Sequence, residues 1–401
     1  MYLSFASLVA LATSAAAKNL FVSSYAGSIT SLSLTESYDG YYDLRAVSST
    51  NASSPNPSWL TLSPQHRTLY CMDEGLEVPN GSLTSYKVHD DGSLVKLDRK
   101  ATISGPVSGV IYNGVKGSSA MAIAHYTGHG LSVWDLSRQG QVEEIQNFTF
   151  TLPHPGANPV RQDSSHPHEA ILDPTGQYVL SPDLGADLVR VFKIDPKTTL
   201  LKESEPLKLN PGYGPRHGLF WFPRGKPQKQ VPIYFYLVSE LTSHIDGFKV
   251  TYPAAGGISF EKIFETTSYG GPEKPDGALA AEIQLSPDNR FITVSNRNDS
   301  SFIIPSTGSG NSTNATIEYS DSLATFKPQL DGSLDFVELA PAGGSIPRQF
   351  SISKTGEFFA VGLSDSSRVV ILARDIASGV VLGPVAEIHI DGEVTCVVWD
   401  E

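Results

Sequence analysis

The stretch HPHEAILDPTGQYVLSPDLGADLVRVFKID, from His166 to Asp195, decides the fold. It contains a short apolar strand, a Pro-Thr-Gly turn, a second strand, a polar turn and a third, alternating strand. The same pattern returns as EIQLSPDNRFITVSNRNDSSFII from Glu282 and as RQFSISKTGEFFAVGLSDSSRVVILARD from Arg348. The chain is therefore predicted to be built from repeated units of β-strands.

Weaker copies of the unit extend the series toward the N-terminus, starting at Trp59, near Ser108 and at Arg216. Successive copies begin roughly 50 to 65 residues apart, a spacing that suits the four-stranded blade of a β-propeller. The first strands, NLFVSSYAGSITSLSL, lack the opening strand of the unit, and the final EVTCVVWD supplies one. We therefore predict an all-β, seven-bladed propeller formed by residues 18–401 as one domain and closed by pairing of its terminal strands.

Composition and charge exclude several classes of partner. The 401 residues are 40% hydrophobic and 18% charged, with 35 Gly, 27 Pro and a net charge of −13. Nucleic acids and anionic membranes bind dense Lys/Arg surfaces, so neither is an expected partner. No nucleotide-binding loop, zinc-protease motif or serine-hydrolase elbow is present. We expect a globular monomer that binds a small molecule and carries no cofactor.

The first 17 residues predict a signal peptide. An apolar run from Leu8 to Ala12 precedes Ala15 and Ala17, which fit an A-x-A cleavage site, although a buried first strand is the alternative. Beyond it no apolar run approaches the roughly 20 residues that span a bilayer. Secretion is the predicted localisation. Six N-x-[ST] sequons are candidate glycosylation sites, at Asn51, Asn80, Asn147, Asn298, Asn311 and Asn314.

The two cysteines and a histidine pair leave smaller questions. Cys71 and Cys396 either form one disulfide or lie buried as small apolar side chains, and both readings stay open. The pair His166-x-His168 places two imidazoles on one face of a strand, a spacing found in metal sites. Because no cysteine accompanies the pair and the other histidines are scattered, no metal is predicted.

Polar residues recur where the predicted inner strands begin. In a propeller these strands line the central channel, so residues distant in sequence meet there. First strands contribute His168, Arg216, His217, Glu282 and Arg348, and second strands add Glu240 and Arg297. Such residues either surround a binding site or form ion pairs between blades. By strand alternation, His217 is expected to point away from the face used by Arg216.

Five segments carry a family resemblance: HPHEAILDPTGQYVLSPDLGADLVRVF, GPRHGLFWF, YLVSELTSHIDGF, LSPDNRFITVSNR and IPRQFSISKTGEFFAVG. They resemble the seven-bladed lactonase propellers of the cycloisomerase 2 family, which includes 6-phosphogluconolactonase and the fungal carboxy-cis,cis-muconate cyclase. The resemblance implies catalytic roles for one His, two Arg and one Glu. Carried over by motif, these are His168, Arg216, Arg297 and Glu240.

The chemistry of these residue types agrees with lactone-ring reactions. Arg216, Arg297 and Arg348 are suited to hold carboxylate or phosphate and to stabilise a developing oxyanion. Either His168 or Glu240 acts as the general base, and His217 and Glu282 are further substrate-binding candidates. We predict hydrolysis of a small acidic, sugar-type lactone. The alternatives are lactonisation of a muconate-type substrate and a non-catalytic propeller that binds a ligand or a protein.

Overall fold

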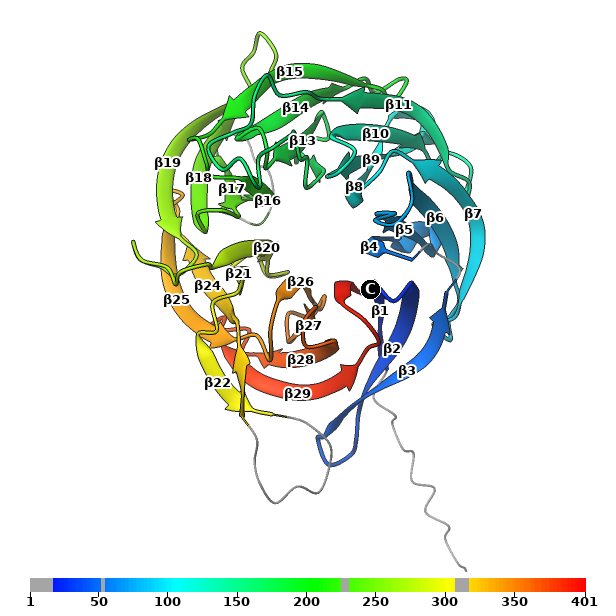
Figure 1. Cartoon of the computed structure of the whole chain (residues 1–401), viewed down its shortest axis with the longest axis vertical. Helices are drawn as coiled ribbons and strands as arrows, with labels where there is room; N and C mark the ends of the chain where they lie inside the picture. Colours follow the sequence, from blue (N-terminus) through cyan, green and yellow to red (C-terminus); the bar gives the residue numbers. More distant parts are fainter. Residues whose placement is uncertain (1–16, 52–54, 224, 226–230, 307–316) are drawn as a thin grey trace, which may run out of the picture.

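The computed structural model describes residues 17–51, 55–223, 225, 231–306 and 317–401. Seven four-stranded antiparallel sheets surround a central axis, with the inner strand of each sheet nearest the centre (Figure 1). The prediction of a seven-bladed all-β propeller is confirmed. The predicted signal peptide, Asn311 and Asn314 lie outside the described residues. Within those residues, no helix is long and apolar enough to cross a bilayer.

Each blade is described from its inner strand outward. The first contains β30 (Val394–Trp399), β1 (Lys18–Ser24), β2 (Ser28–Glu36) and β3 (Tyr42–Thr50). The second contains β4 (Pro57–Ser63), β5 (Thr68–Asp73), β6 (Gly81–Val88) and β7 (Leu94–Thr102). The third contains β8 (Pro106–Asn113), β9 (Ser119–His125), β10 (Gly130–Asp135) and β11 (Glu143–Thr149), and the fourth contains β12 (Ile171–Leu172), β13 (Tyr178–Asp183), β14 (Leu188–Ile194) and β15 (Leu201–Lys208).

The remaining blades follow the same order. The fifth contains β16 (Pro215–Trp221), β17 (Ile233–Ser239), β18 (His244–Thr251) and β19 (Ser259–Thr267). The sixth contains β20 (Leu279–Leu285), β21 (Ile292–Arg297), β24 (Ser322–Pro328) and β25 (Leu334–Pro341), and carries the hairpin β22 (Phe302–Pro305) and β23 (Ile317–Ser320). The seventh contains β26 (Pro347–Ile352), β27 (Phe358–Leu363), β28 (Arg368–Arg374) and β29 (Val381–His389).

The ring closes between the two ends of the chain, as predicted. Strand β30 pairs antiparallel with β1, with Leu20 opposite Trp399 and Ser23 opposite Cys396. Figure 1 shows the C-terminal strand beside the N-terminal one on the inner side of that blade. Because each blade is then flanked by two others, no blade is left with an open face.

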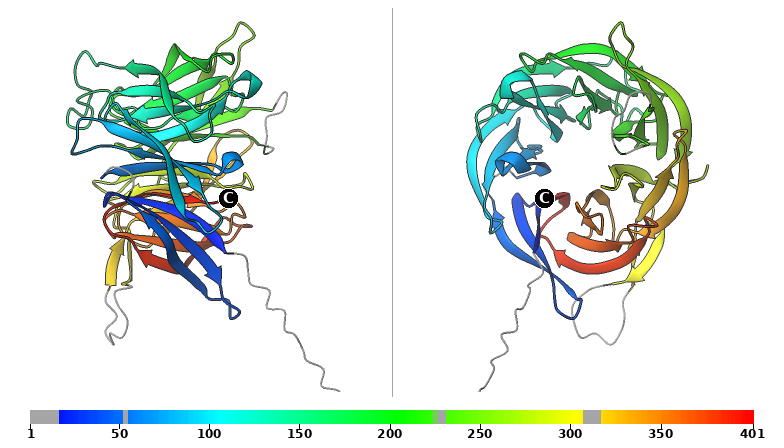
Figure 2. Two further views of the ribbon diagram at one scale, coloured as in Figure 1. Left: turned by 90° about the vertical axis from the view of Figure 1, so that its right-hand side faces the viewer. Right: turned by 180° about the vertical axis from the view of Figure 1, so that it is seen from behind.

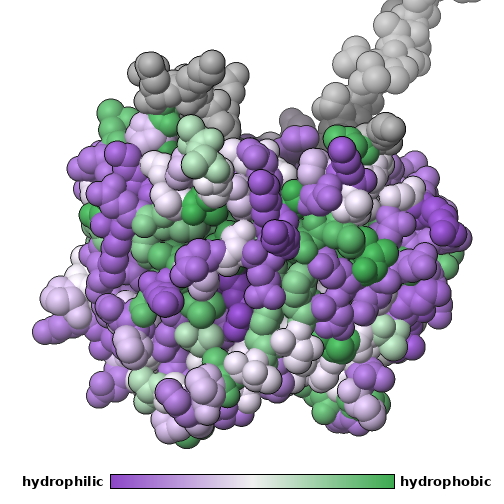
Figure 3. Space-filling view, turned by 90° about the horizontal axis from the view of Figure 1, so that it is seen from above, coloured by the Kyte–Doolittle hydropathy of each residue, from purple (hydrophilic) through white to green (hydrophobic). Residues whose placement is uncertain are grey.

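The core lies between neighbouring blades. One cluster joins Leu20 and Val397 of the first blade to Phe358 and Ile371 of the seventh, all of them buried. Burying a side chain of this size contributes about 1.5–3 kcal/mol relative to leaving it exposed. In the side view on the left of Figure 2, the blades form a single layer around the ring. The side of the ring that Figure 3 shows carries hydrophilic residues interspersed with apolar ones.

Both cysteines lie in the core between the first and second blades. Cys71 on β5 and Cys396 on β30 are free thiols, fully buried in one cluster with Phe21 and Leu60. Burial raises the pKa of Cys396 to about 12. Of the two readings that the sequence left open, the structure shows buried thiols.

A β-bulge recurs at the start of the inner strands and changes one prediction. The pairing register shifts between Pro215 and His217, and the same shift occurs at Pro57/Trp59, Pro106/Ser108 and Pro347/Gln349. A bulge inserts one residue and breaks the alternation of side chains. Arg216 and His217 consequently both face the central cavity described below. The expectation that His217 points away was wrong because it assumed an unbroken strand.

Candidate active site

The candidate residues meet at one end of the channel. Inner strands begin at this end and second strands finish there, so Arg216 near the start of β16 lies close to Glu240, directly after β17. Arg297 is the last residue of β21 in the next blade, and His168 precedes β12 in the previous one. The structure therefore brings the four predicted catalytic residues, His168, Arg216, Glu240 and Arg297, into one cluster.

Glu240 is the centre of this cluster and is completely buried. Its Oε2 lies 2.5 Å from Nη1 of Arg216 and 2.9 Å from Nη2 of Arg297, while Oε1 accepts a hydrogen bond from Arg161. Burial by itself raises the pKa of Glu240, but Arg297, Arg216 and Arg161 together hold it far below the usual range. Glu240 is thus a fixed anion that organises three guanidinium groups.

His168 lies next to Arg216. Nη1 of Arg216 is 2.5 Å from Nε2 of His168, and Nε2 of His217 is 3.2 Å from its Nδ1. Burial, Arg216 and His217, in that order, hold the pKa of His168 well below its usual value, with further contributions from Arg348 and Arg297. His168 is therefore a neutral imidazole at neutral pH. Burial and Arg297 lower the pKa of Arg216 to about 10, which leaves this side chain charged.

A second ionic cluster, formed by Arg348 and Glu74, comes from other blades than the Glu240 cluster. Nη2 of Arg348 lies 3.1 Å from Oε1 of Glu74, which also accepts a hydrogen bond from the Tyr25 hydroxyl. The Arg348 guanidinium lies 5.4 Å from the centre of the Tyr25 ring. Burial raises the pKa of Tyr25 far above its usual value. Arg348 is thus held by the second and first blades rather than by Glu240.

A small enclosed cavity lies on the axis, at the point where the inner strands converge. Its lining comes from the inner strands of several blades: Ser58, Trp59, Val107, His168, Arg216, His217, Arg348, Gln349 and Thr395. The Nε–H groups of Arg216, which lines the cavity, and of Arg297, which contacts Glu240 outside the lining, are buried and have no hydrogen-bond partner among the described residues. Buried polar groups in folded proteins are nearly always paired, so these two donors are available to a ligand.

Glu282 does not line this cavity. Its Oε2 lies 3.2 Å from Nδ1 of His217, so His217 separates Glu282 from His168. The sequence predicted a direct substrate contact for Glu282, whereas the structure places it in a layer behind His217. The alternative reading of these residues as ion pairs between blades also holds in part, since Arg297 and Glu240 come from neighbouring blades.

Four residues at the site were not predicted. Tyr25, Glu74 and Tyr126 each follow the second strand of a blade directly, as Glu240 does. Aligning those strand ends, and not only the strand starts, indicates all three. Arg161 comes from the long connection between β11 and β12. It has no counterpart in the repeat, and no sequence signal points to it.

The histidine pair considered for a metal has other partners. His166 stacks on the Tyr126 ring at 4.2 Å, and His168 meets the same ring edge-on at 5.5 Å. Nδ1 of His166 lies 2.9 Å from the carbonyl oxygen of Tyr126, and Nε2 lies 2.9 Å from Asp163. Among the described residues, no group of three His, Cys, Asp or Glu side chains is arranged to hold a metal ion.

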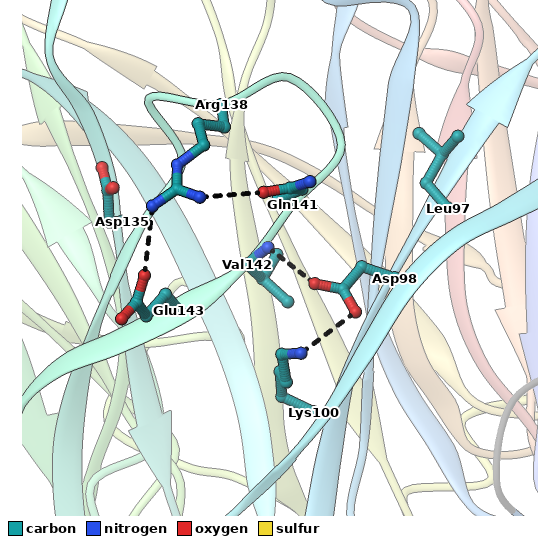
Figure 4. Close-up of a pocket in the computed structure, with 8 residues that line it drawn as sticks. All are labelled: Leu97, Asp98, Lys100, Asp135, Arg138, Gln141, Val142 and Glu143. Carbon is teal, nitrogen blue, oxygen red and sulfur yellow. Dashed lines mark hydrogen bonds and ion pairs between the residues drawn. The ribbon is translucent and has the colours of Figure 1, made fainter.

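A second pocket lies away from the channel, against the outer strands of the second and third blades (Figure 4). Its charged groups contact each other. Asp98 accepts from the backbone N–H of Val142 at 3.2 Å and lies 3.4 Å from Lys100, and Arg138 lies 3.7 Å from Glu143. The remaining charged group, Asp135, accepts hydrogen bonds from Ser137, so every charged side chain of this exposed pocket has a polar partner, and we assign the pocket no chemistry.

Comparison with known proteins agrees with the fold. The sequence model of the family described as "Lactonase, 7-bladed beta-propeller" matches residues 19–399. A protein of Arthroderma benhamiae named "Probable 6-phosphogluconolactonase" is 31% identical over 357 residues, covering 88% of this chain and 83% of that protein. The 6-phosphogluconolactonase of Formosa agariphila is 27% identical, covering 81% of this chain and 83% of that protein.

A solved structure confirms the architecture. The periplasmic gluconolactonase of Pseudomonas aeruginosa superposes with a TM-score of 0.75 at 24% identity, covering 96% of this chain and 99% of that one. At this identity the likeness concerns the fold alone. Together with the family match, the findings define the class as a seven-bladed β-propeller. The chain belongs to the lactonase family of seven-bladed β-propellers.

Proposed function

We propose that the protein hydrolyses the ring ester of a small acidic, sugar-type lactone, as a 6-phosphogluconolactonase does. One observation carries the proposal: two unpaired guanidinium N–H groups, on Arg216 and Arg297, lie in a buried cluster with the neutral imidazole of His168. Lactone hydrolysis needs a base for water and donors for an oxyanion. The names of the Arthroderma and Formosa relatives point to the same reaction.

Charge at the site favours an acidic substrate. Four guanidinium groups, those of Arg161, Arg216, Arg297 and Arg348, are held by only two carboxylates, Glu240 and Glu74. The whole chain carries a net charge of −13, so this excess of positive charge is local. A cationic cleft with low-dielectric walls attracts anions and pairs with carboxylate or phosphate through two parallel hydrogen bonds.

Between the two candidate bases, the contacts favour His168. Both oxygens of Glu240 are occupied by arginines, and a carboxylate in that state is a weak base. His168 has only the Arg216 contact at Nε2. Its low pKa keeps it unprotonated in slightly acidic solution, where lactones hydrolyse slowly on their own.

The reaction follows from these roles. When substrate binds, Arg216 exchanges its contact with Nε2 of His168 for one with the lactone. His168 then removes a proton from water through the freed Nε2, and the resulting hydroxide oxygen bonds to the lactone carbonyl carbon. The carbonyl oxygen becomes an oxyanion, which accepts hydrogen bonds from Arg216 and Arg297. When the intermediate collapses, the bond between the carbonyl carbon and the ring oxygen breaks. The leaving alkoxide takes the proton from Nε2 of His168, and the hydroxy acid is released.

A direct assay tests the function. The purified full-length protein is incubated at pH 6 with glucono-δ-lactone, its 6-phosphate and glucaro-lactone, and acid release is followed by titration. We expect catalysed ring opening, fastest with a charged lactone. Turnover of carboxymuconate to its lactone, with none of the three lactones opened, would instead support the cyclase alternative. No turnover of any substrate would favour a binding propeller.

Arg161 is expected to determine selectivity for charged substrates. It is the most exposed of the four arginines, with 34% of its side chain accessible, and its contact with Glu240 leaves other donors free for substrate. We predict that Arg161→Ala raises KM for an anionic lactone about tenfold, the value of one charge-assisted hydrogen bond, and changes kcat little. Uncharged glucono-δ-lactone provides the control. An equal loss with both substrates would contradict this role.

We further propose that the protein is secreted and glycosylated. The predicted leader supports export, and the sequons at Asn51, Asn80, Asn147 and Asn298 lie at exposed positions. Expression of the full chain in a fungal host should place the protein in the medium, and treatment with an N-glycosidase should lower its apparent mass. Retention in the cytosol without a mass change would contradict the proposal.

A further inference from the structure

We propose that His217 and Glu282 form a relay behind His168 that sets its tautomer and stabilises its protonated form. This inference rests on the proposed function, in which His168 is the base. The contacts are consecutive. Nε2 of His168 faces Arg216 at 2.5 Å, Nδ1 of His168 faces Nε2 of His217 at 3.2 Å, and Nδ1 of His217 faces Glu282 at 3.2 Å.

The position of each proton follows from the first contact. A guanidinium can only donate hydrogen bonds, so Nε2 of His168 must accept one. Nδ1 of the neutral ring therefore carries the proton and donates it toward Nε2 of His217. His217 in turn carries its proton on Nδ1, directed at Oε2 of Glu282. All three side chains are at most 5% exposed, so water does not compete for these contacts.

The groups around the relay hold it in one arrangement. The other carboxylate oxygen of Glu282, Oε1, accepts from the backbone N–H of Ile283 at 3.2 Å and from Nε2 of Gln284 at 3.1 Å. Oε2 of Glu282 and Nδ1 of His217 lie 3.2 Å apart as an ion pair, and neither atom makes a hydrogen bond among the described residues. The Trp59 ring packs edge-on against His217 at 5.7 Å. The imidazole of His217 is thereby confined between His168 and Glu282.

The relay has a defined chemical task. When water gives its proton to Nε2 of His168, the ring becomes a cation among the nearby cationic side chains. The Nδ1 proton of His168 can then shift to Nε2 of His217 while the Nδ1 proton of His217 shifts to Oε2 of Glu282. The shift returns when His168 protonates the leaving alkoxide. Glu282 and His217 are positioning residues, since neither needs to touch the substrate.

The negative charge of Glu282 counteracts the cationic groups around His168, which disfavour its protonated form. The ionisable groups that face His168 are Arg216 and His217 from β16, Arg297 from β21, Arg348 from β26 and Tyr126 after β9. Glu169, which follows His168 in the sequence, accepts a hydrogen bond from the backbone N–H of Gly218 at 2.7 Å. Burial, and secondarily Glu282, raises the pKa of Glu169 well above its usual range. Glu169 is therefore a partly buried carboxyl group close to the relay but outside it.

Because Glu282 belongs to the relay and Glu169 does not, the same substitution at the two positions gives a matched pair of variants. Glu282→Gln removes the carboxylate at the end of the relay, and Glu169→Gln makes the same change at a carboxyl group that is outside the relay and whose pKa burial raises. We expect Glu282→Gln to lower kcat for lactone opening at least about tenfold, as removal of the group that orients a base does, and to change KM less than about threefold. The acid limb of kcat/KM should move to lower pH, because losing the anion makes His168 harder to protonate. Glu169→Gln should leave both unchanged.

A second measurement needs no activity. Nitrogen-15 NMR of the full-length protein labelled in histidine reports which ring nitrogen carries the proton, and His217→Gln assigns the signals. We expect neutral His168 and His217, both protonated at Nδ1. A proton on Nε2 of His168, or identical kinetics for the Glu282→Gln and Glu169→Gln variants, would overturn the relay. If no lactone is opened, the proposed function fails, and the NMR result still decides the relay.

Discussion

His168→Ala is expected to lower kcat/KM for lactone hydrolysis by about 10²- to 10⁴-fold, the usual contribution of a positioned general base. In the structure His168 is a neutral base in contact with Arg216, whereas the carboxylate of Glu240 is occupied by three arginines. Initial rates at pH 6 with an acidic lactone, followed by titration of the released acid, measure the effect.

The control for this variant is His154→Ala. His154 is exposed on the connection between β11 and β12, and its ring contacts only the neighbouring carbonyl oxygen of Pro155 among the described residues. Its replacement should leave the rate unchanged. A His168→Ala variant that keeps the wild-type rate would remove His168 from the mechanism. Loss of activity in both variants, with an altered circular dichroism spectrum, would point to misfolding.

The fold could be predicted from the sequence because its signal is repeated. Strand, turn and strand recur in six places, and the missing inner strand at one end of the chain matches a spare strand at the other. The cluster of His168, Arg216, Glu240 and Arg297 was predictable for a related reason. Equivalent positions in a propeller converge on the axis, so the register of the repeat gives the neighbours of each residue.

Other parts of the site depend on features that the repeat does not encode. The bulge after Pro215 reverses the direction expected for His217, and a bulge has no fixed sequence signature. Arg161 lies in a connection of irregular structure, where neither period nor motif constrains the side chain. The order of contacts from His168 through His217 to Glu282 depends on rotamers set by packing. Pattern alone therefore assigned Glu282 to the substrate.

Glu240→Gln is expected to destabilise the protein by about 3–5 kcal/mol at neutral pH, the cost of breaking a buried ion pair from one side. Three guanidinium groups would lose their shared anion, and the amide would place N–H donors against other donors. Urea unfolding of the full chain measures the change. Glu265→Gln is the control. This carboxylate of the same blade is 36% exposed and forms an ion pair at the surface. Its replacement should lower the free energy of unfolding by less than about 1 kcal/mol.

The pH dependence of unfolding and the effect of added anions show whether the missing charge causes the loss of stability in Glu240→Gln. The pKa of Glu240 is lowered in the folded protein, so its contribution is complete above the unfolded value of about 4.3 and declines as pH falls below it. The stability difference between wild type and Glu240→Gln should therefore narrow in acid. Inorganic phosphate should stabilise Glu240→Gln more than wild type, because an anion can replace the missing carboxylate between Arg216 and Arg297. No stabilisation of either protein by phosphate would mean that the arginines do not form an anion site.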